Sequence, residues 1–561
     1  MRQKPYGRRE QAMGIYLNPG SSRFEMAVNS EVFVDKTAMV SYLNSCVNTN
    51  KRYVSVSRPR RFGKTMAADM VCSYYGRGDG DARALFGGLK VAKTEPVAAR
   101  SGEARDWDFF LGAFDVVRVT VTEFLEDGEG LREAIECLVD EVTGELMEAY
   151  PDVRFGKRVR LHTVMARIHA HTGRRFVIVI DEWDAPMRER PDDEDGQRVY
   201  LDFLRDWLKD QPFVALAYMT GILPIKKYGV HSALNMFDEY SMVAPLQLAE
   251  YAGFTEREVR ELCAGHGRDF SVLREWYAGY EAGGIVPPGE REAPRFSLYA
   301  PLSVAKAVST GKIANYWGGT ETYEALAKYI RRDYDGLREK IVLLMDGARL
   351  PVNLRTYQND MTSFKGADDV LALLIHLGYL GWDSREDVAF VPNREVRQIF
   401  CDSTNEPSWE STFAAIEASK ELVRATIAGE ETRVAELLDK AYDCAGNKTY
   451  NSEAALSYAV RLAYYAAQKW YTEVVELDSG RGYADVAYLP SPRCPEKPAL
   501  LVELKWMSDA DTALSQIRDR RYHGRLEHYL ENLLLVGISY DRDARPGSRG
   551  YKRHTCRIER A

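Results

Sequence analysis

The sequence lacks the features that define several classes of protein. Its eight cysteines are scattered, and no two of them form a Cys-x-x-Cys pair, so neither a zinc framework nor a disulfide scaffold is expected. No uninterrupted apolar run is long enough to cross a bilayer. The basic residues 1–10 contain no apolar segment of the kind that signal peptides have. We therefore expect reduced thiols, no membrane partner and a cytoplasmic protein.

The chain also lacks a strong excess of either charge. Its formal net charge is −8, so no global basic field indicates nucleic acid, although a local basic groove stays compatible with this value.

With 561 residues the chain is too long to fold around a single ordinary hydrophobic core. Its content of 45% hydrophobic and 28% charged residues is typical of globular proteins. We expect three domains, at 1–248, 249–404 and 405–561.

The most informative stretch is Ser-Arg-Pro-Arg-Arg-Phe-Gly-Lys-Thr at 57–65. An alternating run at 53–56 predicts a strand before it, and residues 66–72 predict a helix after it. Backbone N–H groups at the start of such a helix bind anions, which is the setting of a phosphate-binding loop. We expect Lys64 to reach the β- and γ-phosphates of ATP and Thr65 to place its hydroxyl on Mg²⁺.

The remaining loop residues fit this prediction with one departure. Gly63 allows the backbone to approach the phosphates, and Arg61 and Phe62 complete the predicted ATP-binding segment with Arg58. Arg58 stands where the pattern G-x-x-x-x-G-K-[ST] has its first glycine. A basic turn before a surface helix is the alternative for the loop taken alone.

A second element follows at 176–182. Five apolar residues predict a strand buried on both faces, as in a parallel sheet, and Asp181 and Glu182 come directly after it. We expect Asp181 to hold Mg²⁺ and Glu182 to polarise the attacking water, the alternative being a solvated acidic turn. Thr220 ends the next predicted strand and either senses the γ-phosphate or caps the strand. Strands alternating with helices from 53 to 220 predict a parallel α/β fold.

A second constellation lies near the C-terminus. Asp485 falls in a predicted strand, and Glu503 and Lys505 lie on one face of the next. Their carboxylates, completed by Glu453, could hold Mg²⁺ or Mn²⁺, and Lys505 could orient a nucleophilic water. Gln516 and Tyr522 could position a phosphate, and the arginines at 518–525 could meet backbone phosphates. A structural ion pair and a solvated helix face are the alternatives.

The whole chain resembles a bacterial and archaeal family of AAA-ATPase-like proteins with a C-terminal PD-(D/E)XK nuclease domain. The resemblance rests on the motifs at 33–37, 57–65, 180–186, 220–221, 276–280, 376–380 and 392–395, and on Asp485 with Glu503-Leu504-Lys505. An arginine in place of the first glycine is usual in that family. The resemblance implies a P-loop ATPase core, a helical and winged-helix-like middle and a restriction-endonuclease-like end. Defence against mobile DNA or DNA processing is the role it suggests.

Together these observations predict an ATP-dependent or ATP-regulated nuclease that cuts DNA. The alternative is a nucleotide-switched binding or signalling module whose C-terminal domain holds nucleic acid or protein without cutting. The residues identify no arginine finger. A finger supplied by a second subunit would imply a homo-oligomer, which the sequence leaves open.

Overall fold

The computed structural model describes residues 14–561 with gaps at fourteen short segments. These are 79–80, 99–103, 126–129, 157–158, 226–233, 288, 318–329, 331–335, 358–363, 405–409, 445–452, 479–482, 520–525 and 542–552. The chain divides into two compact units. Unit 1 comprises Met1–Tyr329 and Pro351–Ile399, and unit 2 comprises Ile330–Leu350 and Phe400–Ala561.

Unit 1 is built on a five-stranded parallel sheet. Its strands are β1 (Tyr53–Ser57), β4 (Asp115–Thr120), β5 (Phe176–Asp181), β6 (Val214–Gly221) and β7 (Asp238–Tyr240). The strand order is β4-β5-β6-β1-β7, and every neighbouring pair is parallel. All residues of β1, β5 and β6 are buried, because both faces of the sheet are covered. The parallel α/β fold expected for residues 53–220 is confirmed.

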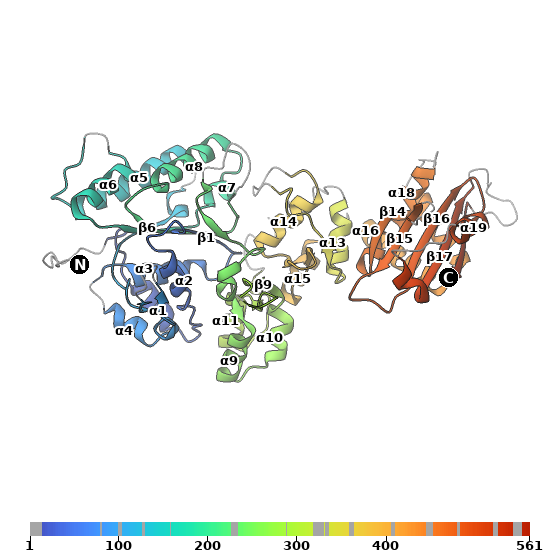
Figure 1. Cartoon of the computed structure of the whole chain (residues 1–561), viewed down its shortest axis with the longest axis horizontal. Helices are drawn as coiled ribbons and strands as arrows, with labels where there is room; N and C mark the ends of the chain where they lie inside the picture. The colour runs from blue at the N-terminus through green and yellow to red at the C-terminus, as the bar shows by residue number, and fades with distance from the viewer. Residues whose placement is uncertain are drawn as a thin grey trace. The chain divides into compact units, whose positions relative to one another are not determined.

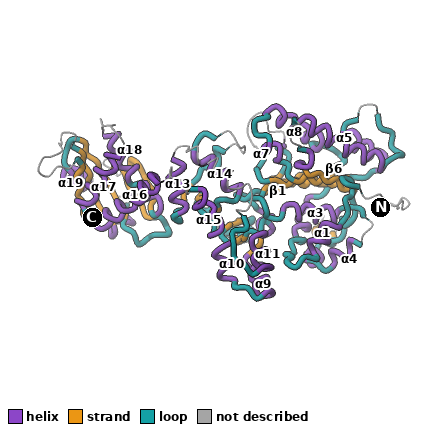
Figure 2. Tube along the Cα trace, turned by 180° about the vertical axis from the view of Figure 1, so that it is seen from behind, coloured by secondary structure: helices purple, strands orange, loops and turns teal. Residues whose placement is uncertain are grey.

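Helices cover both faces of this sheet (Figures 1 and 2). One face carries α1 (Ser22–Val28), α2 (Met39–Cys46), α3 (Lys64–Tyr75) and α4 (Ala82–Gly87), and the other carries α5 (Leu131–Ala149), α6 (Leu161–Thr172) and α8 (Glu194–Leu208). A separate hydrophobic cluster fills each interface. Short elements connect them: η1 (Lys90–Lys93), β2 (Val97–Ala98), β3 (Ala104–Arg105), η2 (Val121–Phe124) and α7 (Ala185–Glu189).

A helical region follows the sheet. It contains η4 (Leu246–Tyr251), β8 (Phe254–Thr255), α9 (Glu256–His266), α10 (Phe270–Tyr277), β9 (Tyr280–Gly283), β10 (Arg295–Tyr299) and α11 (Pro301–Thr310). The three strands form a small antiparallel sheet in the order β8-β10-β9. Helix α9 begins with a capping box: Glu258 N donates to Thr255 Oγ1, and Thr255 N donates to Glu258 Oε2 at 2.9 Å.

The last part of unit 1 has a helix–hairpin–helix order. Helix α14 (Ala367–Leu377) precedes the antiparallel strands β12 (Gly381–Asp383) and β13 (Val388–Phe390). Helix α15 (Arg394–Ser403) follows them and continues past Ile399, where unit 1 ends. This order is compatible with the winged-helix-like middle that the family resemblance implies, and the winged-helix-like assignment stays a prediction.

Unit 2 is built on a mixed five-stranded sheet in the order β14-β15-β16-β17-β18. The strands are β14 (Tyr471–Asp478), β15 (Tyr483–Pro490), β16 (Ala499–Trp506), β17 (Leu533–Tyr540) and β18 (His554–Arg560). Only β16 and β17 are parallel, and α19 (Ala510–Asp519) connects them. The other elements are α13 (Leu337–Met345), α16 (Glu410–Ala428), α17 (Glu431–Cys444), α18 (Glu453–Ala463), η7 (Tyr465–Lys469) and η8 (Glu527–Asn532). The two-residue strand β11 (Leu350–Pro351), where the division between the units falls, belongs to the small sheet β11-β13-β12.

The described helices are short and mostly amphipathic. The longest, α5 and α16, have 19 residues each, and both carry several charged side chains. Within the described part of the chain, no helix combines the length and apolar character that crossing a membrane requires.

Candidate functional site

The loop between β1 and α3 turns sharply before the helix begins. Arg61 and Gly63 both have left-handed backbone angles, with φ of 68° and 79°. This region costs a non-glycine residue about 1–2 kcal/mol, so Arg61 must be held there by other contacts. Its Nη1 donates to the carbonyl oxygens of Tyr316 and Trp317, at 2.6 and 3.1 Å. The tip of the loop is thereby attached to the segment that follows α11.

Lys64 opens α3 and its side chain folds back over the loop. Its Nζ donates to the carbonyl oxygens of Pro59 at 2.8 Å and Arg58 at 3.0 Å. Loss of solvent lowers the pKa of Lys64 to about 8, while the carboxylates of Asp184, Asp181 and Glu182 act in the opposite direction. The ammonium therefore lies near the acidic end of β5, in a partly desolvated position.

The two predicted carboxylates lie at the carboxyl end of β5 in different environments. Asp181 is buried, and its Oδ1 accepts hydrogen bonds from Thr220 Oγ1 and from Glu182 N. Arg118 Nη2 lies 3.9 Å from Asp181 Oδ2. Glu182 turns the chain with a φ of 54°, and its side chain is 37% exposed. Asp181 is therefore a fixed carboxylate and Glu182 an accessible one.

The order of the strands places Thr220 between the end of β1, which leads into the phosphate-binding loop, and the end of β5, which carries Asp181. Strand β6 lies between β1 and β5, and its register sets Thr220 opposite Val56 of β1. On the other side it sets Met219 opposite Ile180, one residue before Asp181. Parallel strands bring their carboxyl ends to one edge of a sheet, where ligands bind in open α/β folds. Both predicted roles of Thr220, as a sensor and as a strand-end contact, agree with this position.

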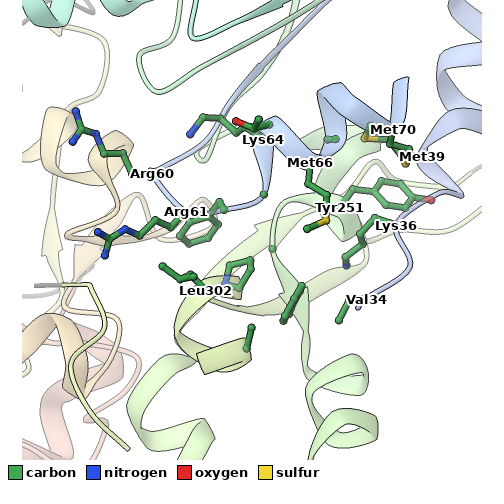
Figure 3. A pocket seen from close by; sticks show the side chains of 18 of the residues that line it. Val34, Lys36, Met39, Arg60, Arg61, Lys64, Met66, Met70, Tyr251 and Leu302 are labelled. Carbon is green, nitrogen blue, oxygen red and sulfur yellow. The ribbon is translucent and has the colours of Figure 1, made fainter. Parts of the chain in front are cut away.

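A cavity of about 670 Å³ opens beside the loop. Most of its wall is apolar, and Glu182, Glu189 and several basic side chains supply its charges. In Figure 3, Arg60, Arg61 and Lys64 lie toward one end, and Met39, Met70 and Tyr251 lie toward the other. The cavity thus has a basic end at the loop and a mostly apolar end, which Lys36 also lines, between the N-terminal segment and the helical region.

The cavity brings together six of the predicted residues: Arg61, Phe62, Gly63, Lys64, Thr65 and Glu182. Asp181, Thr220 and Arg58 are not among the described residues that line it. Arg58 is 2% exposed, and its Nη1 donates to the carbonyl oxygens of Ser57 and Tyr240. Burial lowers the pKa of Arg58 to about 10. In this structure Arg58 joins the loop to β7.

Two further residues at the site were not predicted as functional. Arg188 lines the cavity, and its Nε lies 3.1 Å from Asp184 Oδ2. Asp184 is fully buried, and its Oδ2 also accepts from the backbone N–H groups of Ile222 and Leu223. The four-residue spacing of Asp184 and Arg188 was a signal for a helical ion pair. Nothing in the sequence showed that Arg188 would line the cavity.

The donor atoms at this site suit ATP and Mg²⁺. The volume lies within the range of small-molecule sites, and the helix N-terminus with Lys64 suits phosphate. Thr65, which is exposed at the start of α3, and Asp181 supply the hydroxyl and carboxylate oxygens that Mg²⁺ prefers.

In unit 2, three of the predicted residues lie on adjacent strands. The antiparallel register of β15 and β16 ends at Val486 opposite Val502, so Asp485 and Glu503 come next on their strands. Asp485 Oδ2 accepts from Leu504 N at 2.7 Å, which ties the two strands together. Lys505 Nζ lies 3.6 Å from Glu503 Oε1, and Gln516 Nε2 of α19 donates to the same oxygen. The predicted set is thus assembled around a 1%-exposed Glu503.

Most of the remaining side chains of this constellation lie outside the described residues. The side chain of Glu453, at the start of α18, is not described, and neither are Tyr522 and the arginines at 520, 521 and 525. Arg518 is exposed and pairs with Glu559. Among the described residues, no three His, Cys, Asp or Glu side chains gather as a metal site would require. The metal assignment of Glu453, Asp485 and Glu503 therefore stays a prediction.

Comparison with known proteins identifies the N-terminal region. Residues 20–231 match the model of a family described as "Predicted AAA-ATPase". The match spans the loop at 58–65, Asp181, Glu182 and Thr220. The N-terminal region is therefore AAA-ATPase-like, and its parallel sheet agrees with that class.

Individual proteins are similar to this chain over longer stretches, at low sequence identity. A protein of Azotobacter chroococcum mcd 1, described as an uncharacterized protein in the vnfD 5' region, is 23% identical over 91% of this chain and 93% of the relative. The Walker-type ATPase of Pyrococcus abyssi matches 66% of this chain and 97% of its own, with 11% identity and a TM-score of 0.34. The ORC2 protein of Aeropyrum pernix matches 67% and 96%, with 8% identity and a TM-score of 0.26.

Proposed function

We propose that unit 1 binds and hydrolyses ATP in the cavity beside the loop at 58–65. The observation that carries this proposal is the position of Lys64. It opens a helix at the end of a parallel β-strand, it lines the cavity together with the accessible carboxylate of Glu182, and it falls within the AAA-ATPase family match. The apolar end of the cavity suits a base and the basic end suits phosphates.

The residues of the loop and of β5 then take separate roles. Lys64 leaves the carbonyl oxygens of Arg58 and Pro59 and binds the β- and γ-phosphates. Thr65 and Asp181 would hold Mg²⁺, which when bound neutralises charge on the phosphates. Glu182 orients the attacking water and accepts its proton, because its carboxylate is the exposed one of the pair. Thr220 holds the Asp181 carboxylate in place.

We further propose that unit 2 is a metal-dependent nuclease that acts on DNA. Asp485 and Glu503 lie next to each other on adjacent strands and would supply oxygen ligands to Mg²⁺ or Mn²⁺, with Glu453 as a third. The bound ion would activate water and stabilise the charge of the phosphodiester transition state. Lys505, 18% exposed beside Glu503, would orient that water. We also propose that ATP hydrolysis in unit 1 is coupled to cleavage by unit 2.

One observation favours a second candidate, a nucleotide-switched binding module. Glu503 is already contacted by Lys505 and by Gln516, and Asp485 accepts from the backbone of Leu504. A buried carboxylate with such partners can be a structural ion pair. In that case unit 2 would hold nucleic acid or protein without cutting, and ATP would act as the switch.

Cleavage of supercoiled plasmid separates the two candidates. The full chain is incubated with Mg²⁺ or Mn²⁺, with and without ATP, beside the variants Asp485→Ala and Lys505→Ala. We expect each substitution to reduce cleavage at least about 100-fold, since each removes a group that acts on the reacting phosphodiester. Both variants should keep the ATPase activity, because unit 1 does not contain these residues.

The matched control is Lys440→Ala, which removes an exposed lysine of α17 in the same unit. It should cleave like the unaltered chain. Cleavage that persists in Asp485→Ala would overturn the nuclease assignment. No cleavage by the unaltered chain, together with ATP-dependent retention of the plasmid, would favour the binding module.

A further inference from the structure

The cavity contains a fixed arginine in addition to the basic loop. Arg188, in α7, lines the same cavity as Lys64, Thr65 and Glu182. Its side chain is only 7% exposed, although it faces the cavity. Burial lowers its pKa, but Asp184 and Glu182 outweigh this effect and hold the pKa above its usual value. Arg188 therefore carries its positive charge at neutral pH.

Its orientation is set by contacts on one side of the guanidinium. Nε lies 3.1 Å from Asp184 Oδ2, and that carboxylate is held by Ile222 N and Leu223 N, at 3.0 and 2.8 Å. These contacts connect the backbone after β6, at Ile222 and Leu223, through Asp184 to Arg188 at the cavity. Groups that are fixed before the reaction stabilise a transition state without reorganising during it.

The other side of the guanidinium meets the proposed general base. Nη2 lies 3.4 Å from Glu182 Oε2, within the range of an ion pair. Glu189 Oε1 also lies 3.8 Å from Nη1. A guanidinium has five N–H donors in one plane, so it can contact Asp184, Glu182 and Glu189 and still donate to an oxygen of the γ-phosphate. A phosphate there would compete with Glu182 for the guanidinium and release the carboxylate toward the water.

The other arginines of the cavity are placed differently. Arg61 Nη1 donates to the carbonyl oxygens of Tyr316 and Trp317 and supports the turn of the loop. Arg60 is exposed, whereas the side chain of Arg188 is largely buried. Arg188 lines the cavity, contacts Glu182 directly and is fixed by the buried Asp184.

We propose that Arg188 is the arginine finger of this ATPase site and that it is supplied by the same chain. The inference rests on the proposed ATPase function. In the ATP-bound state its guanidinium contacts the γ-phosphate and stabilises the charge that develops on it during transfer to water. The site is then complete within one chain, and a second subunit contributes no arginine to it.

Single-turnover hydrolysis tests the role of the side chain. We expect Arg188→Ala to lower the rate constant of hydrolysis at least about 1,000-fold, as for other arginine fingers, and to change the ATP dissociation constant less than about tenfold. Arg188→Lys keeps the charge without the planar fork and should recover only part of the rate. The control Arg198→Ala removes a 52%-exposed arginine of α8 and should leave both constants unchanged.

Mixing two inactive variants tests whether the arginine acts within one chain. Lys64→Ala removes the phosphate-binding lysine but keeps Arg188, and Arg188→Ala has the reverse defect. If the finger came from a neighbour, mixed chains would regain activity in the intact loop of the Arg188→Ala chain. We expect no recovery at any ratio, and a hydrolysis rate per chain that does not depend on protein concentration.

The outcomes separate this inference from the proposed function. An unaltered chain that does not bind or hydrolyse ATP would overturn both. Normal hydrolysis by Arg188→Ala, or equal losses of affinity and rate, would overturn only the inference. Recovery of activity on mixing would show that the finger is supplied by another subunit. If Arg188→Ala melts at a lower temperature, the same comparison is made with Arg188→Lys.

Discussion

Lys64 shows how a single residue can be prepared for its ligand before the ligand arrives. Its ammonium is bound to two carbonyl oxygens of its own loop and is surrounded by Asp181, Glu182 and Asp184. Desolvation favours the neutral amine, and the carboxylates favour the ammonium. The outcome is a pKa of about 8, lower than the ordinary lysine value of 10.5.

This balance predicts that ATP affinity depends on pH. Phosphate binding needs the ammonium, so affinity should be nearly constant below pH 8, where Lys64 of the free protein is protonated. It should fall as pH rises through about 8, by up to about tenfold per pH unit. Titration of ATP binding between pH 7 and 9.5 measures this. An unchanged affinity up to pH 9.5 would contradict the account.

The residue scale also shows where inference from sequence ends. The Gly-Lys-Thr string with a strand before it was enough to place Lys64 and Thr65 at the start of α3. The direction of the Arg58 side chain depends on Tyr240, which lies 182 positions away. The Arg188–Glu182 contact likewise depends on how α7 leaves β5. Contacts of this kind are set by tertiary packing, and local patterns do not record them.

At the element scale, the loop is held from one side by the helical region. Phe62 packs against Tyr280 and Trp317, with ring centroids 5.2 and 6.1 Å apart. A side chain at Gly378, which has a φ of 86°, would collide with Trp317 and with Pro59 of the loop. Motifs that are far apart in the sequence therefore meet at the tip of the phosphate-binding loop.

Glu395 of α15 secures this arrangement. It is fully buried, and its Oε1 accepts from Ser303 Oγ, Tyr316 N and Trp317 N, at 3.0, 2.7 and 3.0 Å. The carboxylate thus joins α15 to α11 and fixes the segment that carries Trp317. Arg61 binds the carbonyl oxygens of the same two residues. The loop and α15 are connected through this short segment.

Removing this carboxylate should destabilise unit 1. Glu395→Ala would leave two buried N–H groups and one hydroxyl without their acceptor, and we expect a loss of about 3 kcal/mol in the free energy of unfolding. ATP affinity should fall as well, because Trp317 would no longer be held against Phe62. Urea unfolding and ATP titration measure the two effects. The control Glu261→Ala removes an exposed carboxylate of α9, and equal stability of the two variants would contradict the account.

Elements with strong periodic signals were the ones that the sequence predicted. The apolar run before Asp181 became the buried strand β5, and the alternating run at 53–56 became the buried strand β1. The order β4-β5-β6-β1-β7 was not predicted, because strand order depends on how the helices cross the sheet. The buried acceptor role of Glu395 was also missed, since a charged residue in a helix normally faces solvent.

For the whole molecule, the two compact units separate the two proposed chemistries. Lys64, Glu182 and Arg188 lie in unit 1, and Asp485, Glu503 and Lys505 lie in unit 2. Composition and length predicted several domains. They gave no indication that each unit would be made of two separate stretches of the chain. Residues 330–350 belong with the C-terminal unit, although residues 351–399 belong with the first. Such an exchange reflects packing of distant segments, which one-dimensional patterns do not encode.

The most direct test of the central claim is ATP binding by the full chain and by Lys64→Ala. Calorimetric titration of ATP with Mg²⁺ at pH 7 is compared with the control Lys51→Ala, which removes an exposed lysine just before β1. The account predicts binding by the unaltered chain and by the control, and at least about 100-fold weaker binding by Lys64→Ala, because a charged contact to phosphate is lost. Equal affinity of all three proteins would contradict the placement of ATP at this loop.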